Sequence, residues 1–116
     1  MKVLVVDDSA VMRKIVIKAL GEGGHSDVVE AANGQEALAK SKGVDVVFTD
    51  WNMPVMDGLT FVKELRKTSH VPIIMVTTEG GQKEVLEAMK SGVNDYIVKP
   101  FKPNVLLAKI ETLIKR

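Results

Sequence analysis

Short apolar runs alternate along the chain with stretches in which apolar residues recur every three or four positions. The runs predict five β-strands, at residues 3–6, 28–32, 44–49, 71–76 and 96–98. The periodic stretches predict five helices, with apolar positions between 12 and 20, around 37 and 38, between 59 and 65, between 85 and 89, and between 105 and 114. This alternation favours an α/β fold in which a parallel sheet is covered by helices on both faces.

The five predicted strands differ in how apolar they are. Residues 3–6 are valine and leucine without interruption, which is typical of a strand buried on both faces. Residues 28–32 include Glu30, so we expect a partly exposed strand at one edge of the sheet. Ser9 can cap the first helix, and Pro103 suits the first turn of the last one.

Composition narrows the function classes. The 116 residues fit one domain and show no linker or repeat, so we expect residues 1–116 to form a single domain. The 16 basic and 15 acidic residues leave a net charge of +1, which argues against a nucleic-acid binder. Without cysteine there is no disulfide or thiolate metal site. No apolar run is long enough for a signal peptide or a membrane helix, so we expect a cytoplasmic protein without membrane insertion.

Polar side chains stand directly after four of the predicted strands. They are Asp7, Asp8, Asp50, Thr77, Thr78 and Lys99. In a parallel sheet the carboxyl ends of the strands border one crevice, where ligands bind. If these four strands are neighbours, three carboxylates, two hydroxyls and one ammonium face a common pocket.

Such a cluster predicts phosphoryl chemistry. Two carboxylates about 4 Å apart repel by roughly 4 kcal/mol at an effective dielectric constant near 20, so the acids need a cation. Oxygen ligands without histidine or cysteine favour a hard ion, and we expect Mg²⁺. A carboxylate can itself attack phosphorus and form an aspartyl phosphate. Lys99 and the Thr77 hydroxyl would stabilise charge on the transferred group.

The order and spacing of Asp7-Asp8, Asp50, Thr77 and Lys99-Pro100-Phe101 resemble the receiver domain of two-component response regulators. The resemblance covers the whole chain. Residues 50–54 and 8–13 look most like those of the stand-alone chemotaxis regulators. The resemblance implies a flavodoxin-like, doubly wound (βα)₅ fold whose five-stranded parallel sheet has the order 2-1-3-4-5.

The resemblance also implies roles for the acidic residues. Asp50 would accept phosphate from a sensor histidine kinase. Asp8 would bind Mg²⁺ directly, Asp7 mostly through water, and Asn52 through its backbone carbonyl. Lys99 would pair with Asp50 and then with the phosphoryl group, and its peptide bond to Pro100 would be cis.

A switch and an output surface follow from the same resemblance. Thr77 would move toward the phosphoryl group and Tyr96 would rotate inward. The fourth helix, fifth strand and fifth helix would bind a partner such as a flagellar switch protein, through Val85, Met89, Tyr96 and Val98. Val85 and Met89 at helical spacing fit core positions equally well. Asn52 and Glu79 predict fairly rapid autodephosphorylation, and the protein is expected to be a monomer.

Three alternatives stay open. Under the main hypothesis the chain is a phosphoacceptor signalling protein rather than an enzyme. The same residues also fit an intermediate of a phosphorelay, or a receiver excised from a larger regulator. A phosphatase with an aspartyl-phosphate intermediate fits less well. Phosphatases of the haloacid dehalogenase type place the nucleophile and a second acid two residues apart, whereas Asp7 and Asp8 are adjacent.

Overall fold

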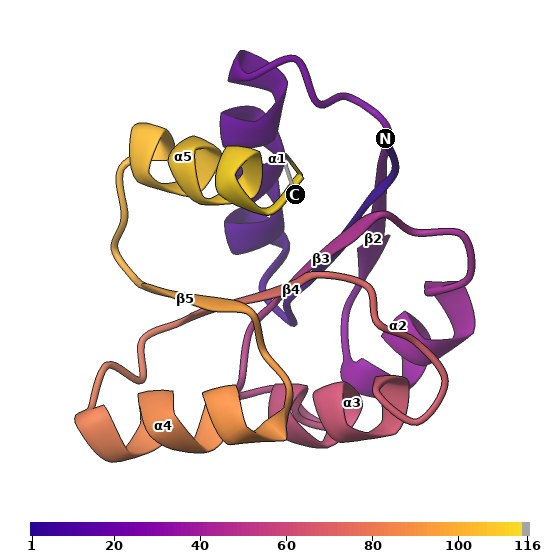
Figure 1. The fold of residues 1–116 in the computed structure, drawn as a ribbon. Helices are drawn as coiled ribbons and strands as arrows, with labels where there is room; N and C mark the ends of the chain where they lie inside the picture. The colour runs from indigo at the N-terminus through magenta and orange to yellow at the C-terminus, as the bar shows by residue number, and fades with distance from the viewer. Residues whose placement is uncertain (115–116) are drawn as a thin grey trace.

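The computed structural model describes residues 1–114 as five strands alternating with five helices (Figure 1). In chain order they are β1 (Val3–Val6), α1 (Ala10–Glu22), β2 (Val28–Ala31), α2 (Gly34–Lys40), β3 (Val46–Thr49), α3 (Gly58–Leu65), β4 (Ile73–Thr77), α4 (Gln82–Ser91), β5 (Asp95–Val98) and α5 (Pro103–Ile114). Residues 115 and 116, which the predicted domain includes, lie outside the described residues.

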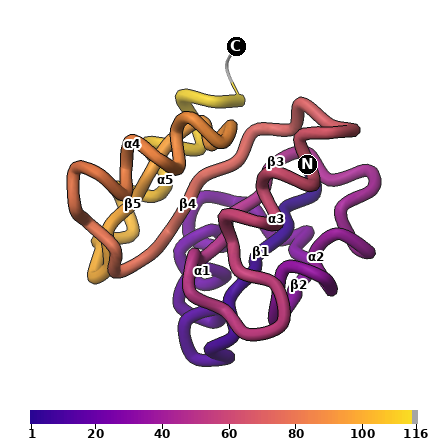
Figure 2. The backbone as a smooth tube through the Cα atoms, turned by 90° about the horizontal axis from the view of Figure 1, so that it is seen from below, coloured from indigo at the N-terminus to yellow at the C-terminus, as the bar shows by residue number. Residues whose placement is uncertain are grey.

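The strands form one parallel sheet in the order β2-β1-β3-β4-β5. Helices α1 and α5 lie on one face, and α2, α3 and α4 lie on the other (Figure 1). Seen from below, β5 and β4 are at the left and β1 and β2 at the right (Figure 2). The predicted fold class and strand order are therefore confirmed.

The core consists of two apolar layers separated by the sheet. Leu4 and Val6 of β1 point into the layer under α2, α3 and α4, while Val3 and Val5 point into the layer under α1 and α5. Side chains of a strand alternate between its two faces, so a strand between two layers must be apolar throughout. Strand β2 is only partly buried and lies at an edge, as its sequence predicts.

Some boundaries differ from the prediction. Strand β3 begins at Val46 rather than at residue 44, and β4 begins at Ile73, after Pro72. Proline has no N–H to donate, which explains the late start of β4. On α1 the buried stripe is Val16, Ala19 and Leu20, so Ile15, expected on the same face, is left 46% exposed. Across residues 1–114, no helix has the combined length and apolarity that a membrane crossing requires.

Candidate functional site

Three carboxylates meet at the carboxyl ends of β1 and β3. Val6 pairs with Thr49, so the two central strands end level and deliver Asp7 and Asp50 side by side. Oxygens of Asp7, Asp8 and Asp50 lie within 4.8 Å of one another. Asp7 and Asp50 are buried, with 4% and 8% exposure, whereas Asp8 is exposed and opens the cluster to solvent.

The loop after β3 holds the Asp50 carboxylate by its own backbone. The Trp51 N–H donates to Asp50 Oδ1 at 2.7 Å, and the Gly58 N–H donates to the Trp51 carbonyl at 2.8 Å. A Cβ on Gly58 would stand 1.9 Å from the Asp50 carbonyl oxygen, so only glycine fits where α3 begins. Asp57 then caps α3 by accepting from the Thr60 N–H at 2.8 Å.

The turn after β1 holds Asp7 in a similar way. Asp7 Oδ1 accepts from the Ser9 N–H at 2.9 Å, and its backbone carbonyl accepts from Arg13 Nη1 at 2.6 Å. Ser9 also caps α1, because its hydroxyl accepts from the Met12 N–H at 3.2 Å. Sequence reasoning missed Arg13, which no local pattern relates to Asp7.

Lys99 bridges the two buried acids. Its ammonium donates to Asp7 Oδ2 at 2.8 Å and to Asp50 Oδ2 at 3.1 Å. Burial by itself lowers the pKa of the Lys99 ammonium, but the hydrogen bonds to Asp7 and Asp50 and their negative charge outweigh burial and raise that pKa above its ordinary value. The peptide bond to Pro100 is cis, as the resemblance implies.

The cluster suits a hard cation. Its donors are carboxylate oxygens from three residues, with neither histidine nor cysteine among them, and such donors favour ions of the Mg²⁺ or Ca²⁺ type. Asn52, predicted to add its carbonyl, is exposed beside the cluster, and its side-chain amide donates to Glu79 Oε1 at 3.0 Å. The acidic cluster can therefore hold a metal ion.

The opposite side of the site comes from the end of β4. Thr77 is fully buried, and its hydroxyl accepts from the Glu79 N–H at 3.4 Å. Tyr96 is half-buried, and its hydroxyl donates to the Glu79 carbonyl. Burial, followed by the charges of Glu79, Glu84 and Asp50, raises the pKa of Tyr96 to about 12. Tyr96 thus already touches the β4–α4 loop, and the rotation predicted for it stays a prediction.

The predicted partner face is partly exposed. Met89 and Val98 are 42% and 44% exposed, and Val85 is half-buried. The only buried residue of α4 is Ala88, so Met89 is not a core residue. Leu86, which sequence reasoning did not assign to this face, is 55% exposed.

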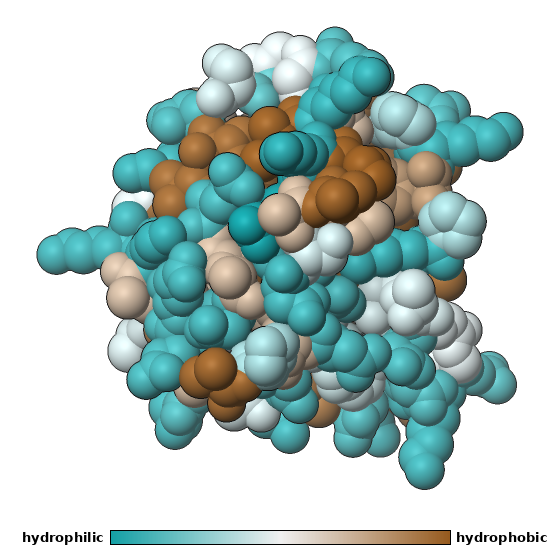
Figure 3. All heavy atoms as spheres, turned by 180° about the vertical axis from the view of Figure 1, so that it is seen from behind, coloured by the Kyte–Doolittle hydropathy of each residue, from teal (hydrophilic) through white to brown (hydrophobic). Residues whose placement is uncertain are grey.

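An apolar hollow of about 440 Å³ adjoins the acidic site. It is lined by Met12, Ile15, Thr78, Lys99, Pro100 and Phe101. In the view from behind, apolar atoms gather in the upper half of the molecule, at the height of α1 and α5 in Figure 1 (Figure 3).

Comparison with known proteins agrees with this geometry. Residues 3–111 match the model of the response regulator receiver domain. The chain belongs to this family. Among similar receiver proteins, a chemotaxis protein CheY homolog of Campylobacter jejuni is 55% identical, over 98% of this chain and 92% of the relative.

Solved structures of receiver proteins have the same fold. Chemotaxis response regulator CheY4 of Vibrio cholerae has a TM-score of 0.88 at 42% identity, covering 97% of both chains. A chain in the complex of CheX, CheY, BeF₃ and Mg²⁺ from Borrelia burgdorferi has a TM-score of 0.91 at 28% identity, covering 98% of this chain and 89% of that one.

Proposed function

We propose that the protein is the phosphoacceptor of a two-component system, in which Asp50 takes a phosphoryl group from a sensor histidine kinase. A carboxylate oxygen of Asp50 attacks phosphorus while the bond from phosphorus to the histidine nitrogen breaks. The observation that carries the proposal is the position of Asp50 Oδ2, 3.1 Å from the Lys99 ammonium and within a cluster of three carboxylates. Lys99 and the Thr77 hydroxyl would stabilise charge on the transferred group.

We propose Mg²⁺ as the cofactor. Asp8 and Asp50 would hold the ion directly, Asp7 through water, and Asn52 through its backbone carbonyl. When bound, Mg²⁺ neutralises charge that develops on the phosphoryl oxygens. The all-oxygen donor set supports this choice of ion, as does the presence of Mg²⁺ in the complex of the Borrelia burgdorferi relative.

The test is labelling with acetyl phosphate and Mg²⁺, followed by intact mass spectrometry. We expect wild-type protein to gain one base-labile phosphoryl group and Asp50→Asn protein to gain none. Asp57→Asn is the matched control, because Asp57 lies in the same loop and asparagine still caps α3. Equal labelling of wild-type and Asp50→Asn protein would contradict the assignment, and equal labelling with a chelator present would contradict the metal.

The protein would also release its phosphoryl group fairly rapidly. The hydrogen bond between Asn52 and Glu79 stands beside Asp50 and supports a role for both side chains in admitting the attacking water. We expect Asn52→Ala and Glu79→Ala to change the rate of phosphate release from labelled protein. A wild-type lifetime of hours would contradict rapid autodephosphorylation.

We further propose a role in chemotaxis, in the cytoplasm and as a monomer, with a flagellar switch protein as output partner. The similarity to chemotaxis proteins supports the role, and exposed Met89 and Val98 support the α4–β5–α5 face as the binding surface. The alternative is a phosphorelay intermediate. Binding to a switch-protein peptide or to a histidine phosphotransfer domain, with and without beryllofluoride, distinguishes the two.

A further inference from the structure

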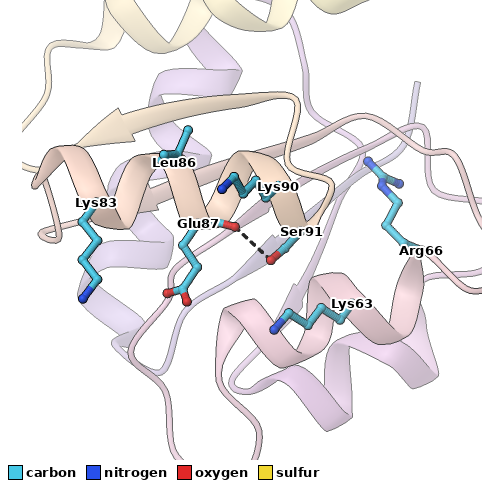
Figure 4. Close-up of a pocket in the computed structure, with 7 residues that line it drawn as sticks. All are labelled: Lys63, Arg66, Lys83, Leu86, Glu87, Lys90 and Ser91. Atoms are coloured by element: carbon cyan, nitrogen blue, oxygen red, sulfur yellow. Dashed lines mark hydrogen bonds between the residues drawn. The ribbon is translucent and has the colours of Figure 1, made fainter.

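A second charged feature lies away from the acidic site, in the groove between α3 and α4 (Figure 4). The groove has a volume of about 560 Å³ and is lined by Lys63, Arg66, Lys83, Leu86, Glu87, Lys90 and Ser91. Figure 4 shows Lys83 and Glu87 extending from α4 toward α3, with Lys63 on the facing helix. Four cations thus share the groove with a single carboxylate, although the whole chain has a net charge of only +1.

The cations of the groove lack ion pairs in the described part of the chain, whereas some of the other surface cations have them. Lys67, Lys40 and Lys109 each lie 2.6 to 3.1 Å from a carboxylate oxygen. Within residues 1–114, no groove cation comes within 4.0 Å of a carboxylate oxygen. The groove therefore concentrates positive charge that the rest of the described chain does not neutralise.

Hydrogen bonds to neutral groups of the protein hold the Arg66 side chain in place. Its guanidinium donates to the carbonyls of Gly92 at 3.0 Å and Ser69 at 3.2 Å and to Asn94 Oδ1 at 2.9 Å, all of which are neutral. Burial lowers the pKa of Arg66, as expected for a cation without an acidic partner. Because the guanidinium is engaged by the protein itself, the donors that face outward are lysine ammonium groups.

The arrangement of these lysines indicates the kind of partner. Lysine binds phosphate groups as well as carboxylates, so the spacing of the lysines has to indicate which kind of partner fits. Lys83 and Lys90 stand seven residues apart on α4, which is about 10 Å at 1.5 Å per residue. An extended polypeptide covers that length in about three residues, whereas a single small anion does not reach both ends.

Leu86 adds an apolar element between the two lysines. It is 55% exposed and lines the groove beside Glu87. We propose that the α3–α4 groove binds an acidic polypeptide segment of a protein partner, with carboxylates on Lys63, Lys83 and Lys90 and an apolar side chain on Leu86. This surface is separate from Asp50, so the proposal stands whether or not Asp50 is the phosphoacceptor.

The charge part of the proposal is tested with a fluorescein-labelled oligoglutamate peptide that carries one central leucine, by fluorescence anisotropy on the full chain. We expect the Lys83→Gln/Lys90→Gln double variant to bind the peptide roughly three- to tenfold more weakly, as losing two exposed charge pairs implies. The matched control is Lys14→Gln/Lys18→Gln, which removes two exposed lysines of α1 and is expected to bind like wild type. An equal loss of peptide affinity in both double variants would overturn the proposal, because it would mean that the peptide responds to the overall charge of the protein and not to this groove.

The apolar part is tested by comparing Leu86→Ser with Met89→Ser. Both residues are exposed on α4 and line a second hollow beside it, but only Leu86 also lines this groove. Leu86→Ser should weaken binding of the leucine-containing peptide and leave binding of an all-glutamate peptide unchanged. Met89→Ser should change the binding of neither peptide. The absence of any difference between Leu86→Ser and wild type would overturn the assigned contact.

Competition decides the chemical class of the occupant. Inorganic phosphate and a single-stranded oligonucleotide of equal charge should displace the peptide poorly, and stronger displacement by either would overturn the assignment to a polypeptide. Circular dichroism and acetyl phosphate labelling of every variant should match wild type, because none of the substituted residues belongs to the acidic site. A variant that fails either check is replaced by the single Lys63→Gln variant, for which we expect a smaller loss of about two- to threefold.

Discussion

The two helices that begin beside the acidic site, α1 and α4, are held in very different ways. Helix α1 is capped by the Ser9 hydroxyl and buries three residues, whereas α4 begins at Gly81 without a side-chain cap and buries only Ala88. Segments with few buried contacts open most easily. The site therefore has a fixed side, made by the turns after β1 and β3, and a loose side, made by the β4–α4 loop.

This difference suits a switch. The fixed side carries the carboxylates, whose positions must be accurate for the proposed phosphoryl chemistry. The loose side carries Thr77, Glu79 and the contact to Tyr96, and it leads directly into α4. At its far end α4 is anchored again, because the Gly92 carbonyl accepts from Arg66. Charge added at Asp50 would thus act on the end of α4 that is least restrained.

The largest effect should come from disturbing the fixed side at Gly58. In Gly58→Ala the new Cβ would meet backbone atoms of Asp50 and Trp51 at 1.9 to 2.9 Å, so the loop after β3 must shift. We expect a loss of about 3 kcal/mol in the free energy of unfolding, measured with urea. Gly21→Ala is the control: nothing lies within 4 Å of its Cβ, and alanine favours the helix. Equal stability of the two variants would mean that the loop is not tightly packed.

The second prediction concerns the tyrosine on the loose side. The chain has a single tyrosine, so phenolate absorbance reports Tyr96 alone. The folded protein should titrate at about 12, against 10.0 for the ordinary side chain. The pKa of Tyr96 is higher in the folded protein than in the unfolded chain. The contribution of the neutral phenol to the free energy of unfolding is therefore complete below pH 10 and is lost as the pH rises toward 12.

This titration is read only where circular dichroism shows native structure, with protein unfolded in urea as the reference. A folded midpoint near 10 would mean that Tyr96 is turned out to solvent and that the loose side is open in the resting protein. Tyr96→Phe, which cannot donate to Glu79, should abolish the titration altogether.

The contrast between the two sides also explains what the sequence could predict. Asp7 and Asp50 follow apolar runs, and because parallel strands end at one edge, their meeting could be predicted from the pattern. Two hydrogen bonds could not be predicted, namely those from Arg13 to the Asp7 carbonyl and from Arg66 to the Gly92 carbonyl. Each of them joins residues that no local periodicity relates.

Helix α4 shows the same limit for packing. The helical pattern included Val85, Leu86 and Met89, yet none of these three is buried, and Ala88 is the one buried residue of α4. Successive helical residues are about 100° apart, so the neighbouring layer, and not the apolar pattern alone, decides which residue of the helix is covered. That choice depends on tertiary packing rather than on the helix itself.

The third prediction tests the fixed side at its helix cap. Ser9→Ala removes the acceptor for the Met12 N–H and should cost about 1 kcal/mol of unfolding free energy. Ser9→Asn, which keeps an uncharged acceptor, is the control and should stay within a few tenths of a kcal/mol of wild type. If both variants were equally unstable, the loss would come from the added or removed volume and not from the cap.

The smallest effect should come from capping the loose helix. Gly81→Ser supplies α4 with the acceptor it lacks, and the new Cβ meets only the flexible end of Glu84, at 2.0 Å from Oε1. Because glycine is only slightly worse than serine as a cap, we expect a gain of a few tenths of a kcal/mol. The informative measurement is hydrogen exchange: amides at the start of α4 should exchange more slowly than in wild type, while those of α1 should not change. If the amides at the start of α4 are already as protected as those of α1 in wild-type protein, the β4–α4 loop is as firmly held as the fixed side, and the difference between the two helices lies in their sequences and not in their mobility.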